Sequence, residues 1–498
     1  MRNKIISLLL TISIFTSIFA MAAPGAVAME YDDGKILTFY GYEKGAEQVA
    51  FIPQKYPDEL YDKIYNGLIA CDQTIDISEF NVMAEDIGWV YSSLFLNNPE
   101  LFYLDNVFGY AGYPNGVVAF IEPTYKYTGE QLEYVVNDYN DRLDEIVSKF
   151  DMLNNIEAVV AVNDYLAIHY EYDLYNAEVN PQAVIRDAYG MMVNKRGVCQ
   201  GYALLFIAIM NRLGVECASV VSTSMNHQWN VVKLGEYWYH IDVTWDDPTG
   251  VPEGFAYHNY MLQSDKSMNE RLGHYDWVRV DNSTETCYDT KYDDWTWTET
   301  NTQLTPHNGK WYYAINNADS IEIIEISDDG SRRVVHSQQE RWDVWGEPGY
   351  AYTSGFATST WNKNWMLYHS QNKLYCYDTE LDKVFFLTEL DTSLGYVYFV
   401  HIDGDQFEYI VSTSPVDFSN ATHLSIDMND FHYSSDVNAD GITSSADFNL
   451  LRLNMLGYAS DIHYSDVNCD GVADSSDLLR LQQIALGISK PSVVYNFS

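Results

Sequence analysis

The chain has 498 residues, of which 47% are hydrophobic, and it carries a formal net charge of −43 at pH 7. This length predicts about three domains, and the hydrophobic content excludes a disordered chain. A protein this acidic does not neutralise phosphates, so the charge excludes nucleic-acid binding through a basic surface and disfavours adhesion to anionic membranes. It is compatible with solubility and with cation binding.

The first 28 residues have the pattern of a secretory signal peptide. Arg2 and Lys4 precede an apolar run over 5–20, and a small-residue stretch ends at Ala26-Val27-Ala28. We therefore expect cleavage after Ala28. The apolar run is shorter than a membrane span, and no later stretch approaches one. The pattern predicts an exported, extracellular protein without a membrane span after cleavage.

Residues 29–285 predict an α+β domain with a helical N-terminal extension. From about residue 56 to 173 the pattern is mainly helical, and only 112–120 resembles a short strand region. Apolar residues at helical spacing predict long helices over 129–150 and 155–170.

A second part of this domain predicts one helix followed by a sheet. The helix is expected over 199–213 and should end at Gly214. Strands are expected over 215–222, 227–232 and 238–244, and the tight turn Gly235-Glu236 joins the last two. Helices that precede a sheet predict an α+β fold.

Residues 286–425 predict a β-rich region because aromatic and β-branched residues alternate there with polar ones. Asn308–Tyr313 and Asn372–Tyr377 form an imperfect repeat that resembles blades of a propeller. About 140 residues are too few for a complete propeller of four-stranded blades.

Residues 430–490 contain a duplicated acidic loop. Each copy has oxygen-bearing residues at positions 1, 3, 5, 7, 9 and 12 of a twelve-residue loop and glycine at position 6, Gly441 or Gly471. The ligand positions are Asp436, Asn438, Asp440, Ile442 (backbone carbonyl), Ser444 and Asp447 in the first loop, and Asp466, Asn468, Asp470, Val472 (backbone carbonyl), Asp474 and Asp477 in the second. Hard oxygen ligands at this spacing predict two bound Ca²⁺ ions.

The spacing between the loops leaves one helix for each, and such paired loop-helix units resemble a type I dockerin of bacterial multi-enzyme complexes. The resemblance implies a small α-helical, calcium-binding module that binds a cohesin domain of a scaffold protein. In that family positions 10 and 11 often select the partner. Here they are Ser445-Ala446 and Ser475-Ser476, so the two faces are not equivalent.

Six cysteines are scattered without a disulfide framework or a C-x-x-C pair, so a structural zinc site is not expected. Cys199 stands out because it opens a predicted helix directly after Gly197-Val198. A helix N-terminus favours a thiolate, and its backbone N–H groups can stabilise an oxyanion. A lone cysteine is more often a small core residue, as Cys217 is expected to be.

The predicted hairpin adds two candidates. If Gly235-Glu236 is a two-residue loop, Trp229 faces Asp242, and His227 and Asp242 become diagonal neighbours on one face. The His227 Nδ1–H could then bond to the Asp242 carboxylate. His240 shares this face but has a poorer partner, so the register favours His227.

Three segments carry a family resemblance: Gly197–Ala203, His227–Val231 and Tyr239–Asp247. Together they resemble the transglutaminase-like core of papain-type cysteine enzymes, over roughly residues 50–280. The resemblance implies that Cys199 is the nucleophile, His227 the general base and Asp242 its orienting partner. The family includes cross-linking acyl transferases, peptidases, deamidases and inactive members.

The implied reaction is acyl transfer on an amide bond, with water or an amine as acceptor. The dockerin context favours a peptidase or amidase acting on protein or peptide, including protein within plant-wall material, in a polysaccharide-degrading complex. Two alternatives remain open: a cross-linking transglutaminase, and a binding protein with an inactive triad. In the second, tryptophans of the β-rich region would stack on sugar rings: Trp342, Trp345, Trp361 and Trp365. No carboxylate pair suggests a glycosidase there.

Overall fold

The computed structural model describes residues 27–30, 36–43, 55–179, 185–247, 249, 254–317, 320–339, 357–359, 364–414, 418–440, 442–459, 462 and 464–495. The chain divides into two compact units, Met1–Phe95 with Tyr103–Thr128 and Leu96–Phe102 with Gly129–Ser498. The predicted signal peptide falls outside the described residues, apart from its last two positions. Over the described residues, every helix is too short or too polar to cross a bilayer.

The first unit is built on an antiparallel five-stranded sheet in the order β1-β2-β4-β5-β3. Its elements are β1 (Val27–Glu30), β2 (Ile36–Glu43), α1 (Asp58–Ile69), β3 (Ile75–Asp76), η1 (Ser78–Phe80), α2 (Ile87–Asn97, which ends in the second unit), β4 (Leu104–Gly112) and β5 (Val118–Tyr125). Between residues 56 and 173 the elements are mainly helical, as predicted. The single short strand region expected over 112–120 was wrong, because β4 and β5 occupy 104–112 and 118–125, and Gly109 and Gly112 interrupt the alternation by which β4 would be recognised.

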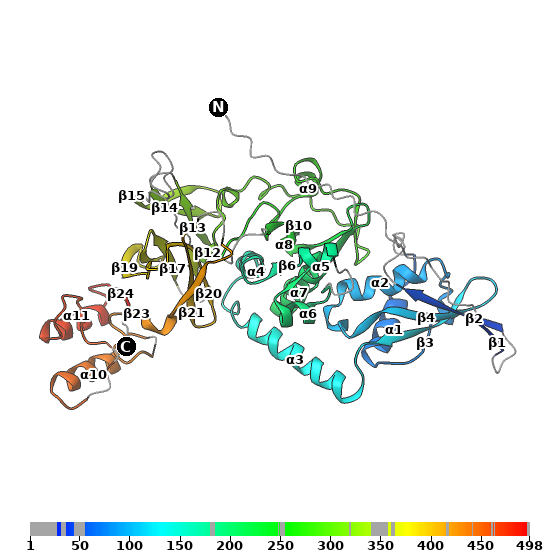
Figure 1. Ribbon diagram of the computed structural model, residues 1–498, viewed down its shortest axis with the longest axis horizontal. Helices are drawn as coiled ribbons and strands as arrows, with labels where there is room; N and C mark the ends of the chain where they lie inside the picture. Colours follow the sequence, from blue (N-terminus) through cyan, green and yellow to red (C-terminus); the bar gives the residue numbers. More distant parts are fainter. Residues whose placement is uncertain are drawn as a thin grey trace. The chain divides into compact units, whose positions relative to one another are not determined.

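The second unit begins with helices that surround one central helix. They are η2 (Pro99–Leu101), α3 (Gly129–Val147), α4 (Asn155–His169), α5 (Leu174–Val179), α6 (Ala188–Asn194) and α7 (Cys199–Leu213). α4 starts at a capping box in which Asn154 and Glu157 exchange side-chain and backbone hydrogen bonds. All residues of α7 from Gly201 to Met210 are buried, so α7 is the core helix of this unit (Figure 1). The predicted helices over 129–150, 155–170 and 199–213 are confirmed.

A four-stranded antiparallel sheet, ordered β10-β9-β8-β11, packs on α7. Its strands are β8 (Cys217–Ser222), β9 (His227–Leu234), β10 (Tyr237–Ile241) and β11 (Trp277–Arg279). Leu234 pairs with Tyr237, which confirms the two-residue turn. The prediction that the last strand reaches Thr244 was wrong: β10 ends at Ile241, and Val243–Asp246 form the short helix α8. The backbone N–H of Asp242 donates to the Tyr260 carbonyl instead of to β9.

Three successive antiparallel meanders form the β-rich region: β12 (Thr305–His307), β13 (Lys310–Asn316), β14 (Ser320–Ser327), β15 (Arg332–Gln339); β16 (Ala357–Ser359), β17 (Trp365–Ser370), β18 (Lys373–Asp378), β19 (Lys383–Glu389); and β20 (Tyr396–Asp403), β21 (Gln406–Ser412), β22 (Thr422–Asp427). The imperfect repeat has a structural basis, because each copy begins at a tight turn with positive φ and leads into β13 or β18. These turns contain Asn308-Gly309 and Gln371.

Trp365 is not available to stack on a sugar. It is 5% exposed, and its Nε1–H donates to Asp378 and to the Tyr433 hydroxyl. The other three tryptophans proposed for that role lie outside the described residues.

The C-terminal region holds two helices, α10 (Ser445–Met455) and α11 (Ser475–Ala485), which lie side by side in Figure 1. Their small core consists of Val437, Leu451, Val467 and Leu481. The segments before and after the helices pair with each other as β23 (Phe431–Tyr433) and β24 (Val493–Tyr495). Phe431 and Val493 are also part of the hydrophobic core of the β-rich region.

The remaining short elements of the second unit connect these parts. They are the parallel pair β6 (Glu171–Tyr172) and β7 (Arg196–Gly197), with α8 (Val243–Asp246), α9 (Asp265–Glu270), η4 (Thr296–Glu299) and η5 (Met428–Asp430).

Candidate active site

Cys199 is the first residue of α7, and the residue as a whole is half-buried. Val198 before it has an extended backbone without a side-chain cap. The turn is held by the pairing of Tyr172 with Gly197 and by the hydrogen bond from Val198 N–H to the Ile185 carbonyl. The thiol therefore lies at the positive end of a buried helix, where an anion is favoured.

Two glycines of the cysteine segment allow α6 to approach it closely. A Cβ atom on Gly197 would lie 2.3 Å from Met191 Sδ and 3.0 Å from the Ile185 carbonyl oxygen. A Cβ on Gly201 would lie 2.8 Å from Met191 Cγ. Met191 is fully buried, so it has little room to move. The two glycines therefore let the start of α7 pack closely against α6, and they take no part in the reaction.

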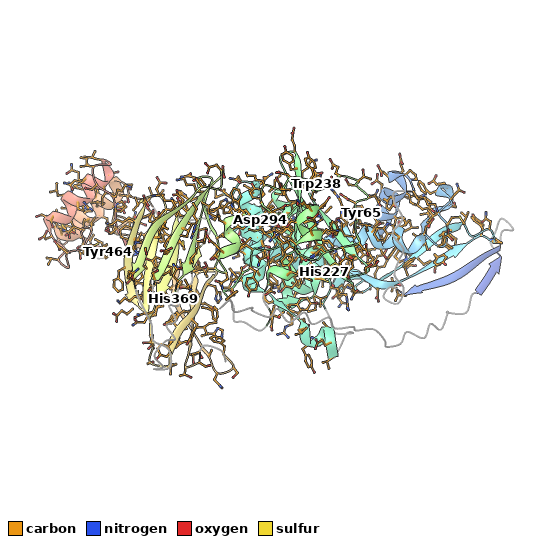
Figure 2. The ribbon with its side chains drawn as sticks, turned by 90° about the horizontal axis from the view of Figure 1, so that it is seen from above. Tyr65, His227, Trp238, Asp294, His369 and Tyr464 are labelled. Atoms are coloured by element: carbon orange, nitrogen blue, oxygen red, sulfur yellow. The ribbon has the colours of Figure 1, made fainter. Side chains whose placement is uncertain are left out.

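His227 and Asp242 meet at the open end of the β9–β10 hairpin, away from its turn. His227 (labelled in Figure 2) is the first residue of β9, and Asp242 follows the last residue of β10. The His227 Nε2 atom lies 2.6 Å from Asp242 Oδ2. The expectation that Nδ1 makes this contact was wrong. Nε2 makes it, which leaves Nδ1 for the hydrogen bond between the His227 ring and the Cys199 thiol.

Electrostatics of the three groups favours the ion pair. Burial alone would raise the pKa of the Cys199 thiol, but the hydrogen bond and charge of His227, with the Gln228 backbone N–H, hold that pKa below its ordinary value. Burial would lower the pKa of His227, yet Asp242 and the Cys199 thiol raise it to about 10. Burial would raise the pKa of Asp242, but His227 and His274 lower it to about 2. The arrangement supports a thiolate–imidazolium pair next to an ionised carboxylate.

His274 was not among the residues predicted from the sequence for this site. Its Nε2 lies 2.8 Å from the same oxygen, Asp242 Oδ2, and its side chain is fully buried. His274 lies 32 positions after Asp242 in the connection between α9 and β11, outside any recognisable motif. His274 is brought to the site by the pairing of β11 with β8, and a three-residue edge strand has too short a sequence pattern to be predicted.

Both ring nitrogens of His240 are hydrogen-bonded to residues outside the candidate triad. The Trp229 indole N–H donates to His240 Nδ1 at 3.0 Å, and His240 Nε2 lies 2.8 Å from Asp265 Oδ1. Trp229 in turn stacks on His227, with ring centroids 5.4 Å apart. His240 thus holds the Trp229 ring on which His227 stacks. Trp245, 41% exposed, borders His227 from α8.

Two clusters of the described residues bring metal-ligating side chains together: His227, Asp242 and His274; and His240, Asp265 and Cys287. Neither fits zinc as placed. Ligands at about 2.05 Å in a tetrahedron lie about 3.3 Å apart, whereas the histidine–carboxylate contacts of the first cluster are 2.6 and 2.8 Å, which are hydrogen-bond lengths. In the second, Nδ1 of His240 accepts from Trp229, so its proton is on Nε2, the atom a metal would need.

The acidic loops have matching geometry. Ala439 and Cys469, at loop position 4, have φ of 58° and 60°. In each loop the N–H at position 5 donates to the oxygens at positions 1 and 3. The residue at position 9 is the N-cap of the helix, and its backbone N–H donates to the carboxylate at position 12 in a capping box. Gly471 has φ of 87°, whereas Gly441 lies outside the described residues. The donor set, carboxylate and amide oxygens held in one turn, suits Ca²⁺.

Residues 144–243 match the model of the transglutaminase-like superfamily, and residues 434–486 match the model of the dockerin type I domain. Both resemblances seen in the sequence are therefore confirmed, together with the α+β class, the β-rich middle region and the dockerin.

Curated relatives share only a segment with this chain. The kyphoscoliosis peptidase of Homo sapiens is 30% identical over 121 residues, which is 21% of this chain and 18% of that protein. The Mus musculus protein of the same name is 29% identical over 121 residues, with the same coverage. The chain thus spans about a fifth of the length of these relatives. A solved structure described as a TGase has a TM-score of 0.20 and 21% identity, covering 30% of this chain and 45% of that one.

Proposed function

We propose that the chain is an exported, scaffold-docked cysteine enzyme that transfers acyl groups from amide bonds. Cys199 is the nucleophile, His227 the acid and base, and Asp242 the partner of His227. The observation that carries this proposal is the hydrogen-bonded series from the thiol through His227 to Asp242 at the start of α7.

In the first half-reaction, the Cys199 thiolate attacks the amide carbonyl carbon and the carbonyl π electrons move to oxygen. The Cys199 backbone N–H, at the first position of α7, is suited to bind this oxyanion. His227 then gives its proton to the leaving amine, the C–N bond breaks and a thioester remains. In the second half, the acceptor attacks the thioester carbonyl carbon while His227 takes its proton, and the C–S bond breaks to restore the Cys199 thiolate. Water releases a carboxylic acid, whereas an amine forms a new amide.

Hydrolysis is the favoured outcome. The relatives named above are called peptidases, and a dockerin would deliver the enzyme to protein that accompanies polysaccharide. This preference rests on analogy with those proteins. The test is cleavage of casein compared with incorporation of a fluorescent amine into glutamine-containing protein, with Cys199→Ala as control. Amine incorporation without cleavage would contradict the peptidase assignment and indicate a cross-linking enzyme instead.

The C-terminal module would bind a cohesin of a scaffold protein and hold two Ca²⁺ ions in the loops that start at Asp436 and Asp466. Calcium would neutralise carboxylates that otherwise repel each other, and would thereby order the module. Binding to a panel of immobilised cohesins, with and without EDTA, tests this. Calcium-independent binding would contradict the role assigned to the loops.

A further inference from the structure

His274 reaches the candidate active site from the connection between α9 and β11. Its backbone N–H donates to the Met268 carbonyl, and the preceding Gly273 has φ of 76°. The ring is enclosed by aromatic neighbours, with centroids 4.9 Å from Trp229 and 4.7 Å from Trp245. These contacts leave the imidazole few orientations, and the observed one directs Nε2 at Asp242.

The contact between His274 Nε2 and Asp242 Oδ2 determines that Nε2 carries a proton. An ionised carboxylate can only accept hydrogen bonds, so His227 and His274 must both present Nε2–H to Asp242 Oδ2. The other oxygen, Asp242 Oδ1, is buried and has no hydrogen-bond partner among the described residues. Both donors therefore bind the same oxygen. Without His274, His227 would be the one remaining side-chain donor to this buried carboxylate among the described residues. Leaving a buried charge with too few donors is costly.

We propose that His274 is a positioning residue of the triad, which donates its Nε2–H to Asp242 and thereby holds the carboxylate where it orients His227 toward Cys199. The role needs only the Nε2 proton, so it is the same whether the His274 ring is neutral or charged. It rests on the proposed function of Cys199 but makes no assumption about substrate.

Other ionisable groups surround the pair and remain unchanged in the test. Those that interact electrostatically with Asp242 or His274 come from several elements: Tyr172, Cys199, His227, His240, Asp246 and Tyr260. Because all of them are present in each variant, a change in the titration of Cys199 reports the loss of the His274 donor.

The test is the pH dependence of Cys199 alkylation by iodoacetamide in the full chain, measured by peptide mass spectrometry. His274→Phe keeps a ring but removes the donor. His274→Gln places an amide nitrogen at the same number of bonds from Cα as Nε2, so it should keep the donor. We expect His274→Phe to raise the apparent thiolate pKa by about one unit, which lowers the alkylation rate about tenfold at pH values below the parent pKa. We expect His274→Gln to stay within about threefold of the parent rate.

His258→Phe is the matched control, since His258 also forms a fully buried contact with an aspartate, Asp164, at 3.0 Å. It should lower the melting temperature without moving the Cys199 titration. If His274→Phe does not fold, His274→Asn replaces it, because its amide is one bond too short to reach Asp242.

The outcomes separate the two proposals. If Cys199 of the parent chain titrates as an ordinary thiol, the proposed function fails. If the parent thiolate pKa is low and His274→Phe or His274→Asn leaves it low, the positioning role of His274 is overturned. It is also overturned if His258→Phe moves the titration as far, or if His274→Gln is as impaired as the variant without the donor, since the effect would then be one of packing.

Discussion

His227 Nε2 lies 2.6 Å from Asp242 Oδ2, and the carboxylate belongs to the residue at which β10 gives way to α8. Two anchors hold that junction: the Asp242 N–H donates to the Tyr260 carbonyl, and the Asp246 carboxylate accepts from the Tyr260 N–H. The orientation of His227 therefore depends on a helix start that is tied to the chain beyond it.

Asp242→Asn should lower kcat/KM by about 10²- to 10⁴-fold, because a neutral amide no longer stabilises the imidazolium of His227. Casein cleavage, or amine incorporation if that is the activity, measures the loss. Asp265→Asn is the matched control, since Asp265 bonds to His240 instead. It should cost less than tenfold. Equal losses in both variants would contradict a special role for Asp242.

Acid should erase the stability that Asp242 contributes. Its pKa is lowered to about 2 by His227 and His274, which outweigh burial. The contribution of the ionised form is therefore complete above about pH 4 and is lost as the pH falls through 2. We expect the melting-temperature difference between the parent chain and Asp242→Asn to shrink from pH 5 to pH 3. A difference that grows in acid would reverse the assigned sign.

Alkylation at pH 6 should favour Cys199 over Cys71, Cys217 and Cys287. The pKa of its thiol is lowered, whereas burial raises the pKa of Cys217 and Cys287 well above the ordinary range and raises that of Cys71. Quantitative mass spectrometry of each cysteine peptide gives the rates. The prediction fails if Cys71 reacts at pH 6 as fast as Cys199.

Gly197→Ala should destabilise the chain by about 1–3 kcal/mol, because the new Cβ would overlap with Met191 Sδ. Met191→Ala alone should also destabilise, by leaving a cavity. The double variant should lose less than the sum, since the smaller side chain accommodates the new methyl group. Thermal unfolding measures all three. Strict additivity would mean that Met191 is not the group that excludes a side chain at position 197.

The sequence was most informative where local chemistry decides the structure. Helix α7 and the turn at Gly235 follow from local patterns, and the turn alone places His227 near Asp242. The ring nitrogen in that contact depends on rotamers packed against Trp229, and the end of β10 depends on Tyr260. His274 is set by tertiary pairing of a three-residue edge strand, which has no local signature.

Removing calcium should unfold α10 and α11 while leaving α7 folded. The acidic loops start helices whose hydrophobic core has four buried residues, too small a core to offset repulsion among uncompensated carboxylates. Hydrogen exchange with EDTA should show lost protection over 445–455 and 475–485. Magnesium, which dehydrates reluctantly, should restore it poorly. Unchanged protection in EDTA would contradict calcium-dependent folding.

The pairing of β23 with β24 has a mechanical consequence. Both strands flank the calcium loops, Phe431 and Val493 are buried with the β-rich strands, and the Lys490 ammonium donates to the Leu381 carbonyl. Under the proposed function, a pull between the scaffold-bound dockerin and a substrate held at Cys199 would therefore act on a short hydrogen-bonded strand pair and a hydrophobic core instead of on a flexible linker. The dockerin would then transmit that force directly to the β-rich region.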